Sequence, residues 1–97
     1  MPKNQKLTKV IAGRTVKVAT TEPEGVLVLF DDQSSMKIKA AGAVAAIPPG
    51  SQVKSVSETK AEFKIEFEDG SSVTLCLADP GSSVAVRDKN NAVEYLG

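Results

Sequence analysis

Residues 62–68 read EFKIEFE, a strict alternation of charged and apolar side chains. Successive side chains of an extended chain point to opposite faces, so Phe63, Ile65 and Phe67 share one face while Lys64 and Glu66 meet water. The stretch therefore predicts a β-strand that is buried on one side.

A second alternating stretch at residues 73–77 follows an Asp-Gly pair, which is typical of a β-hairpin. A two-residue turn would place Phe67 opposite Ser72 and mix the buried and exposed faces. A loop with an odd number of residues keeps all apolar side chains on one face. We therefore expect these opposed pairs: Phe67 with Val73, Ile65 with Leu75, and Phe63 with Leu77.

The same pattern occurs earlier in the chain. Residues 13–41 correspond without gaps to residues 50–78 at a constant shift of 37 positions, as from Phe30 to Phe67. Gln33 stands where the second unit has Gly70, which argues against a turn that requires a positive φ at this position. The apolar positions also correspond: Val26, Val28, Phe30, Met36, Ile38 and Ala40 fall on Phe63, Ile65, Phe67, Val73, Leu75 and Leu77.

The remaining segments complete an all-β chain. Short strands are expected at 15–20 and 52–57, with a bulge where the spacing slips between Val53 and Val56. Residues 40–50 form a connector that ends in Pro48-Pro49, with a possible helical turn over 43–46. Residues 82–97 predict a last hairpin. The predicted fold is a small SH3-like barrel or roll of two pseudo-repeats plus this hairpin, without a convincing helix.

Length and composition fit a single domain over residues 1–97, with a flexible tail at 1–8. The chain has 97 residues, of which 41% are hydrophobic, and no net charge. It has no run of the roughly 20 apolar residues that a membrane-spanning helix needs. The lone cysteine, Cys76, lies on the outward register of its strand and favours a cytoplasmic location, because small secreted domains often carry disulfides.

The residue types offer little for catalysis. The chain has no histidine, which excludes His-based triads and His-ligated zinc. Cys76 consequently has no histidine to activate it, and no phosphate-binding glycine loop is present. The acidic pairs at 31–32 and 68–69 occupy equivalent turns and are more typical of turn formation than of cation binding. We predict no catalytic residue, cofactor or metal site, and hence no enzyme.

Leu27 and Leu29 are the most informative candidates for an interaction. They occupy the outward register, where the second unit has Lys64 and Glu66, so the first hairpin is apolar on both faces. Either the C-terminal hairpin or a second copy of the protein must cover them. Together with Tyr95, the aromatic residue left outside the core, they predict a protein-interaction or self-association module.

The alternative function is nucleic-acid binding. Through Lys39 the chain has seven Lys or Arg against four Asp or Glu, and from Ala40 onward five against eight. A basic patch on a small barrel would bind phosphates in a salt-dependent manner. The candidate contacts are Lys6, Lys9, Arg14, Lys17, Lys37 and Lys39.

Overall fold

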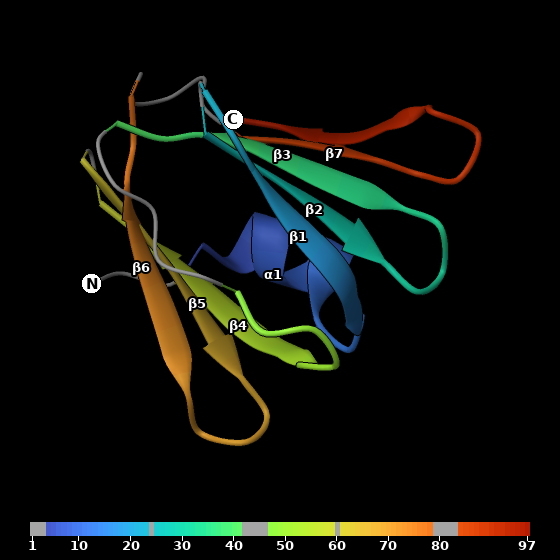
Figure 1. Ribbon diagram of the computed structural model, residues 1–97, viewed down its shortest axis with the longest axis horizontal. Coiled ribbons are helices and arrows are strands. Elements are labelled where there is room, and N and C mark those ends of the chain that lie inside the picture. Colours follow the sequence, from blue (N-terminus) through green and yellow to red (C-terminus); the bar gives the residue numbers. More distant parts are fainter. Residues whose placement is uncertain (1–3, 24, 42–46, 60, 79–83) are drawn as a thin grey trace.

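The computed structural model describes residues 4–23, 25–41, 47–59, 61–78 and 84–97, which are mostly β-strand (Figure 1). A short helix comes first in the chain and eight strands follow. Their bounds are α1 Gln5–Ile11, β1 Val16–Glu22, β2 Gly25–Phe30, β3 Ser35–Lys39, β4 Val53–Glu58, β5 Glu62–Phe67, β6 Ser72–Cys76, β7 Val84–Arg87 and β8 Val93–Leu96.

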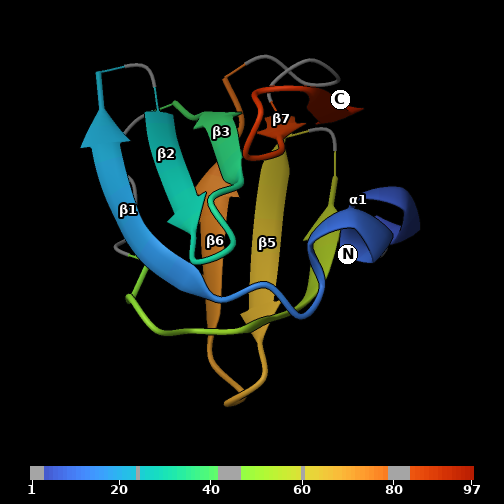
Figure 2. The ribbon, with the colours of Figure 1, turned by 90° about the vertical axis from the view of Figure 1, so that its right-hand side faces the viewer.

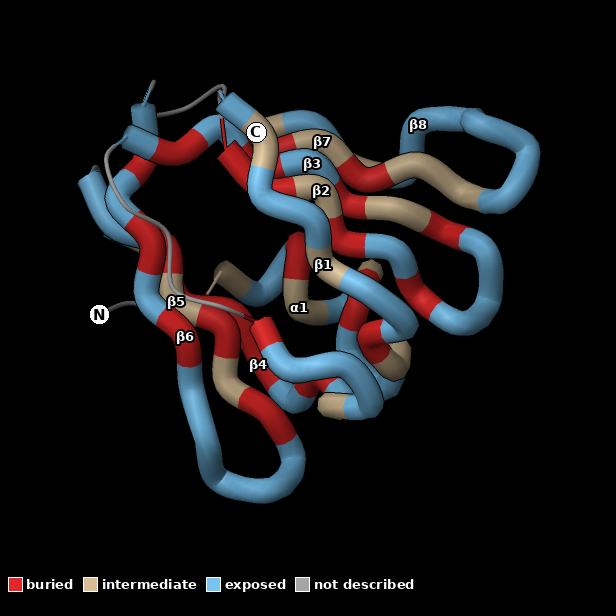
Figure 3. Tube along the Cα trace, in the orientation of Figure 1, coloured by how far each residue is buried: buried red, intermediate tan, exposed pale blue. Residues whose placement is uncertain are grey.

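The strands form two antiparallel sheets that face each other across one core. One sheet has five strands in the order β1-β2-β3-β7-β8, and the other has three in the order β4-β5-β6 (Figure 2). The alternation of the sequence is preserved in β3, β5, β6 and β7, where buried residues alternate with more exposed ones along the strand (Figure 3). The largest fully buried side chains include Phe30, Phe63 and Phe67. The all-β prediction is therefore confirmed.

Helix α1 lies where the sequence predicted a flexible tail and no helix, so that prediction is wrong for residues 4–8. The Asn4 side chain accepts a hydrogen bond from the Leu7 N–H at 3.0 Å and caps the helix. Leu7 and Ile11, one turn apart, are fully buried. The neighbouring residues are mostly polar, so the helical spacing of Leu7 and Ile11 did not stand out in the sequence.

The helix also covers one edge of the three-stranded sheet. The Asn4 N–H donates to the Val56 carbonyl at 2.8 Å, and the Val56 N–H donates to Thr8 Oγ1 at 3.0 Å. An edge strand otherwise leaves such groups to water or to another chain. Helix α1 thus satisfies the β4 edge with backbone and side-chain groups.

The hairpin of the second unit has the predicted faces but a shorter loop than predicted. Ile65 pairs with Val73, and Phe63 pairs with Leu75, so the register is two residues tighter than expected. The Phe67 N–H donates to the Ser71 carbonyl at 2.9 Å, which leaves residues 68–70 as the loop. This odd number of loop residues still matches the apolar faces.

The two hairpin loops have the same backbone, against our interpretation of Gln33. Gly70 has φ +90°, and Gln33 adopts φ +73° at the equivalent position. The Phe30 N–H donates to the Ser34 carbonyl at 2.9 Å, as Phe67 does to Ser71. The pairing of the flanking strands therefore outweighs the side-chain penalty of a left-handed glutamine.

Corresponding positions of the two units also agree elsewhere. The predicted bulge in β4 is present between Val53 and Ser55, and β1 has an unpredicted one between Val16 and Val18. Two isolated bridges, Thr15 with Gln52 and Ala40 with Leu77, join the sheets at residues that lie 37 positions apart. Within the described ranges these bridges connect two separate sheets, and no closed barrel is formed.

The predicted C-terminal hairpin is present as β7 and β8, and β7 pairs with β3. The helical turn considered for 43–46 lies outside the described residues. Among the residues that are described, no helix has the length and apolar character required to cross a membrane.

Candidate functional site: the outer face of the five-stranded sheet

The outer face of the five-stranded sheet exposes apolar side chains to solvent. The registers align Thr20, Leu27, Lys37, Ala85 and Leu96 in one row across this face, and Val18, Leu29, Ser35, Arg87 and Val93 in the next. Val18 is 39% exposed, Leu29 37% and Leu96 67%. With Val93, these are the large exposed hydrophobic residues among those described, so the exposed apolar surface is concentrated on one sheet.

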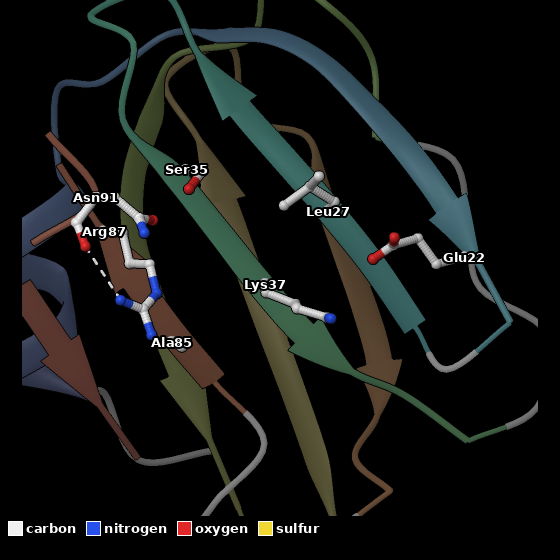
Figure 4. A pocket seen from close by; sticks show the side chains of 7 residues that line it. All are labelled: Glu22, Leu27, Ser35, Lys37, Ala85, Arg87 and Asn91. Carbon is white, nitrogen blue, oxygen red and sulfur yellow. Dashed lines mark hydrogen bonds between the residues drawn. The ribbon is translucent and has the colours of Figure 1, made fainter. Parts of the chain in front are cut away.

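Leu27 lies in a hollow of this face. The hollow has a volume of about 420 Å³ and opens to solvent (Figure 4). Leu27 projects from β2 between side chains of the neighbouring strands, and is only half-buried. The lining residues are Glu22, Leu27, Ser35, Lys37, Ala85, Arg87 and Asn91.

Positive charge flanks the apolar part of the face. Lys37 and Lys39 are exposed on β3, and Arg87 lies on the adjacent strand β7. Arg87 donates one hydrogen bond from its guanidinium to the Asn91 carbonyl at 3.1 Å, which holds it beside the hollow. Glu22 at the end of β1 is the acidic side chain of the hollow. The lining therefore combines aliphatic carbon with a net positive charge.

The three-stranded sheet provides an internal comparison, because its outer face repeats the same registers. Ser55 lies opposite Glu66 as Val18 lies opposite Leu29, and Lys64 takes the position of Leu27. Lys64 Nζ and Glu66 Oε1 form an ion pair at 3.7 Å. This backbone geometry is thus compatible with a polar, ion-paired surface, and Leu27 and Leu29 are not required by the hairpin itself.

The C-terminal hairpin does not cover Leu27 and Leu29. It extends their sheet sideways, with Met36 opposite Val86 and Ile38 opposite Val84. Val84 and Val86 are buried, so β7 satisfies the edge of β3 and contributes to the core between the sheets. The interpretation of this hairpin as an intramolecular cover is therefore wrong.

Tyr95 does not belong to this face. It lies opposite Val86, whose side chain is buried, and its hydroxyl accepts a hydrogen bond from Asn4 Nδ2 at 3.0 Å. Tyr95 therefore helps to dock α1 against β8. The structure brings together Leu27 and Leu29 but separates Tyr95 from them.

The predicted nucleic-acid contacts are spread over several elements. Lys6 and Lys9 lie on α1, Lys17 on β1, and Lys37 and Lys39 on β3. These lysines are spread over different elements, because α1 packs on β4 and on the edge strand β8, whereas β3 is the central strand of the five-stranded sheet and β1 is its other edge.

Arg14, the sixth predicted contact, is engaged within the protein. Its guanidinium pairs with Glu94 Oε2 at 2.7 Å and with Asp32 Oδ2 at 3.6 Å, and it donates to Ser34 Oγ at 3.0 Å. It also lies 6.0 Å from the centre of the Phe30 ring. Arg14 thus ties the start of β1 to the first hairpin loop and to β8.

The acidic residues Asp32 and Asp69 stabilise their turns, which is the role that the sequence favoured. Asp32 Oδ1 accepts a hydrogen bond from the Ser34 N–H at 2.9 Å, and Asp69 Oδ1 accepts one from the Ser71 N–H at 2.9 Å. Burial raises the pKa of Asp32, but the hydrogen bonds from Ser34 and the charge of Arg14 outweigh it and leave the pKa below its ordinary value. Hydrogen bonds from Ser71 lower the pKa of Asp69.

The described residues contain no group of three or more cysteine, aspartate or glutamate side chains placed to hold a metal ion. Every buried side-chain nitrogen and oxygen in the described part of the chain has a hydrogen-bond partner. Cys76 is exposed as a free thiol, as its predicted outward register requires.

Sequence reasoning missed several residues of the face, chiefly Val18, Ala85 and Arg87. Plain alternation places Val18 on the same side as the buried Val16, but the bulge between them turns Val18 outward. A signal was present in the second unit, where the predicted bulge has the same position. Ala85 and Arg87 could be assigned to this face only once β7 was known to pair with β3.

Comparison with known proteins gives no relative: no protein-family model, no curated protein and no solved structure matches this chain.

Proposed function

We propose that the chain is a non-enzymatic protein-interaction module whose docking surface is the outer face of the five-stranded sheet. The observation that carries this proposal is the contrast between Leu27 and Leu29 on β2 and Lys64 and Glu66 on β5. Equivalent positions meet solvent on both sheets, yet only the second pair has side chains suited to water. An apolar sheet face of this kind is usually buried against another layer.

The energetics favour a partner over simple tolerance of exposed leucine. Burial of apolar surface contributes about 25 cal/mol per Å², so leaving Val18 and Leu29 in water forgoes stabilisation that a docked partner would provide. Lys37 and Arg87 at the border would give such a contact orientation and specificity. The hollow around Leu27 would receive one side chain of the partner.

The proposal includes the architecture of the chain. We regard it as two pseudo-repeats of about 37 residues arranged as an SH3-like roll, extended by α1 and by the β7–β8 hairpin. The bridges between Thr15 and Gln52 and between Ala40 and Leu77 support the repeat, as do the bulges at equivalent positions. We also place the protein in the cytoplasm, where a free exposed Cys76 stays reduced.

A graft between the two sheets tests the proposed function. The double variant Leu27→Lys, Leu29→Glu gives β2 the side chains that β5 carries, so the free energy of unfolding should stay within about 1 kcal/mol of wild type. Protein retained from nuclease-treated extract by the immobilised wild type should be lost with the graft. Solution mass by light scattering then shows whether the chain itself is the partner.

The matched control is Ser72→Glu on the exposed outer face of the other sheet, which should retain the same protein. Unfolding of the graft variant would mean that Leu27 and Leu29 belong to the core. Equal retention by graft and wild type would contradict the docking surface. A species that is retained from untreated extract but not from nuclease-treated extract would favour the nucleic-acid alternative.

A further inference from the structure

We infer that the partner of this face is an acidic amphipathic protein segment, with a stripe of aliphatic side chains bordered by carboxylates. This inference rests on the proposed function and adds the chemistry of the partner. It follows from the separation of apolar and basic side chains across the sheet. Val18 and Leu29 lie together on β1 and β2, and the cationic side chains lie on β3 and β7.

The apolar half defines a stripe that one element can cover. Val18 pairs with Leu29, and Leu27 lies two residues along the same strand as Leu29 on the same face. Three aliphatic side chains on two adjacent strands offer a contact for the apolar side of a helix or an extended segment. The small residues Ser35 and Ala85 beyond them leave the hollow open.

The basic half selects the charge of the partner. Lys37 is exposed directly opposite Leu27, and Lys39 follows it along β3. Arg87 lies opposite Ser35, beside the same hollow. In the part of the chain that the structure describes, the ion pairs engage Arg14, Lys64 and their acidic partners, and none of them uses these three cations. Carboxylates placed above β3 and β7 would pair with them.

A second copy docked by the same face fits less well. In a twofold contact with its axis near β3 and β7, Lys37, Lys39 and Arg87 of one copy would approach those of the other, and Glu22 is the one acidic residue among the described residues that line the hollow. Like charges in such a contact oppose association. Nucleic acid also fits poorly, because the centre of the face is aliphatic and the phenylalanines are buried in the core.

Three labelled peptides of about 16 residues test the inference by fluorescence anisotropy. They share one helical stripe of leucines and differ only in the flanking positions, which are all glutamate, all glutamine or all lysine. At about 50 mM salt the glutamate peptide should bind at least about tenfold tighter than the glutamine peptide, and the lysine peptide should not bind. The affinity of the glutamate peptide should fall as the salt concentration rises.

Variants separate the charge from the apolar contact. The double variant Lys37→Glu, Lys39→Glu should weaken binding of the glutamate peptide by about tenfold or more and leave binding of the glutamine peptide unchanged. The graft Leu27→Lys, Leu29→Glu should abolish binding of both peptides. The matched control Thr74→Glu, at the position of the other sheet that corresponds to Lys37, should bind like wild type.

Other outcomes overturn the inference and remain distinct from failure of the proposed function. Equal affinity for all three peptides, lost in the graft, would retain the docking face and reject the acidic partner. A dimer that the graft dissociates, with no peptide bound, would make the second copy the occupant. Binding of anionic vesicles or of DNA without peptide binding would reject both the acidic segment and the protein-interaction module.

Discussion

Thr15 and Gln52 pair in an isolated antiparallel bridge, and the hydrogen bonds around the bridge come in matched sets. The Gly13 N–H donates to the Val53 carbonyl at 2.8 Å, and the Gly50 N–H donates to the Val16 carbonyl at 2.7 Å. Moving each residue to its counterpart 37 positions away converts one bond into the other. These matched hydrogen bonds support the proposed repeat, because two copies related by a twofold rotation would meet in this way.

The proposed repeat predicts equal roles for Phe30 and Phe67. Both are 1% exposed and each lies at the end of the central strand of its unit. Phe30→Ala and Phe67→Ala should each lower the free energy of unfolding by about 3 to 5 kcal/mol, because each leaves a cavity in the shared core. Denaturant titration measures the loss. A change within about 0.5 kcal/mol for either variant would contradict its assignment to the core.

Arg14 should be structurally important despite being a surface-type residue. Its removal breaks the contacts with Glu94, Asp32 and Ser34 together. We expect Arg14→Ala to lower the free energy of unfolding by about 1 to 3 kcal/mol, because charge-assisted hydrogen bonds of a half-buried group are lost. Lys17→Ala, at an exposed position of β1, is the control and should have almost no effect. Equal stability of the two variants would contradict this role.

The two hairpin loops offer a reciprocal exchange. Gln33 has φ +73° and Gly70 has φ +90°, both in the region that favours glycine. Gln33→Gly should raise the free energy of unfolding and Gly70→Gln should lower it, each by about 1 kcal/mol. The midpoint of chemical unfolding measures both changes. Opposite signs are the essential result. Destabilisation by both substitutions would mean that side-chain contacts of Gln33, and not its backbone, dominate.

Asp32 should make stability depend on pH in the acid range. Its pKa is below the ordinary value of 3.8 in the folded protein, so its contribution is complete above that value and is lost as the pH falls through the folded pKa. The stability difference between wild type and Asp32→Asn should therefore narrow below about pH 3.8. Unfolding titrations from about pH 7 to about pH 2.5 measure it. A difference that stays constant over this range would contradict the prediction.

The part of the fold that sequence could predict is the part that alternation encodes. In β5, every second side chain is apolar and the strand pairs along its whole length, so its bounds and buried face followed from the letters alone. The buried faces of β3, β6 and β7 also followed from alternation, whereas β8 has no buried residue and a bulge places Val93 opposite Arg87. The bulge in β4 was predicted because Val53 and Val56 are three residues apart and break the alternation. These features depend on near neighbours in the chain.

The features that sequence missed depend on distant contacts. Helix α1 has only seven residues, which is too short to be stable alone, and is held by the burial of Leu7 and Ile11 and by hydrogen bonds to Val56. The destination of β7 is set by the unpaired edge of β3, which no local pattern reveals. For this reason Leu27 and Leu29 could be selected from sequence, whereas their neighbour Arg87 could not.

Site-specific photo-crosslinking tests the docking face most directly. A photoreactive residue in place of Leu29 and, in a second protein, in place of Glu66 puts the same probe at equivalent positions of the two sheets. After irradiation in living cells, we predict protein adducts at position 29 and few or none at position 66. Equal adduct yields at the two positions, or none at position 29, would contradict the assignment of this face as the docking surface.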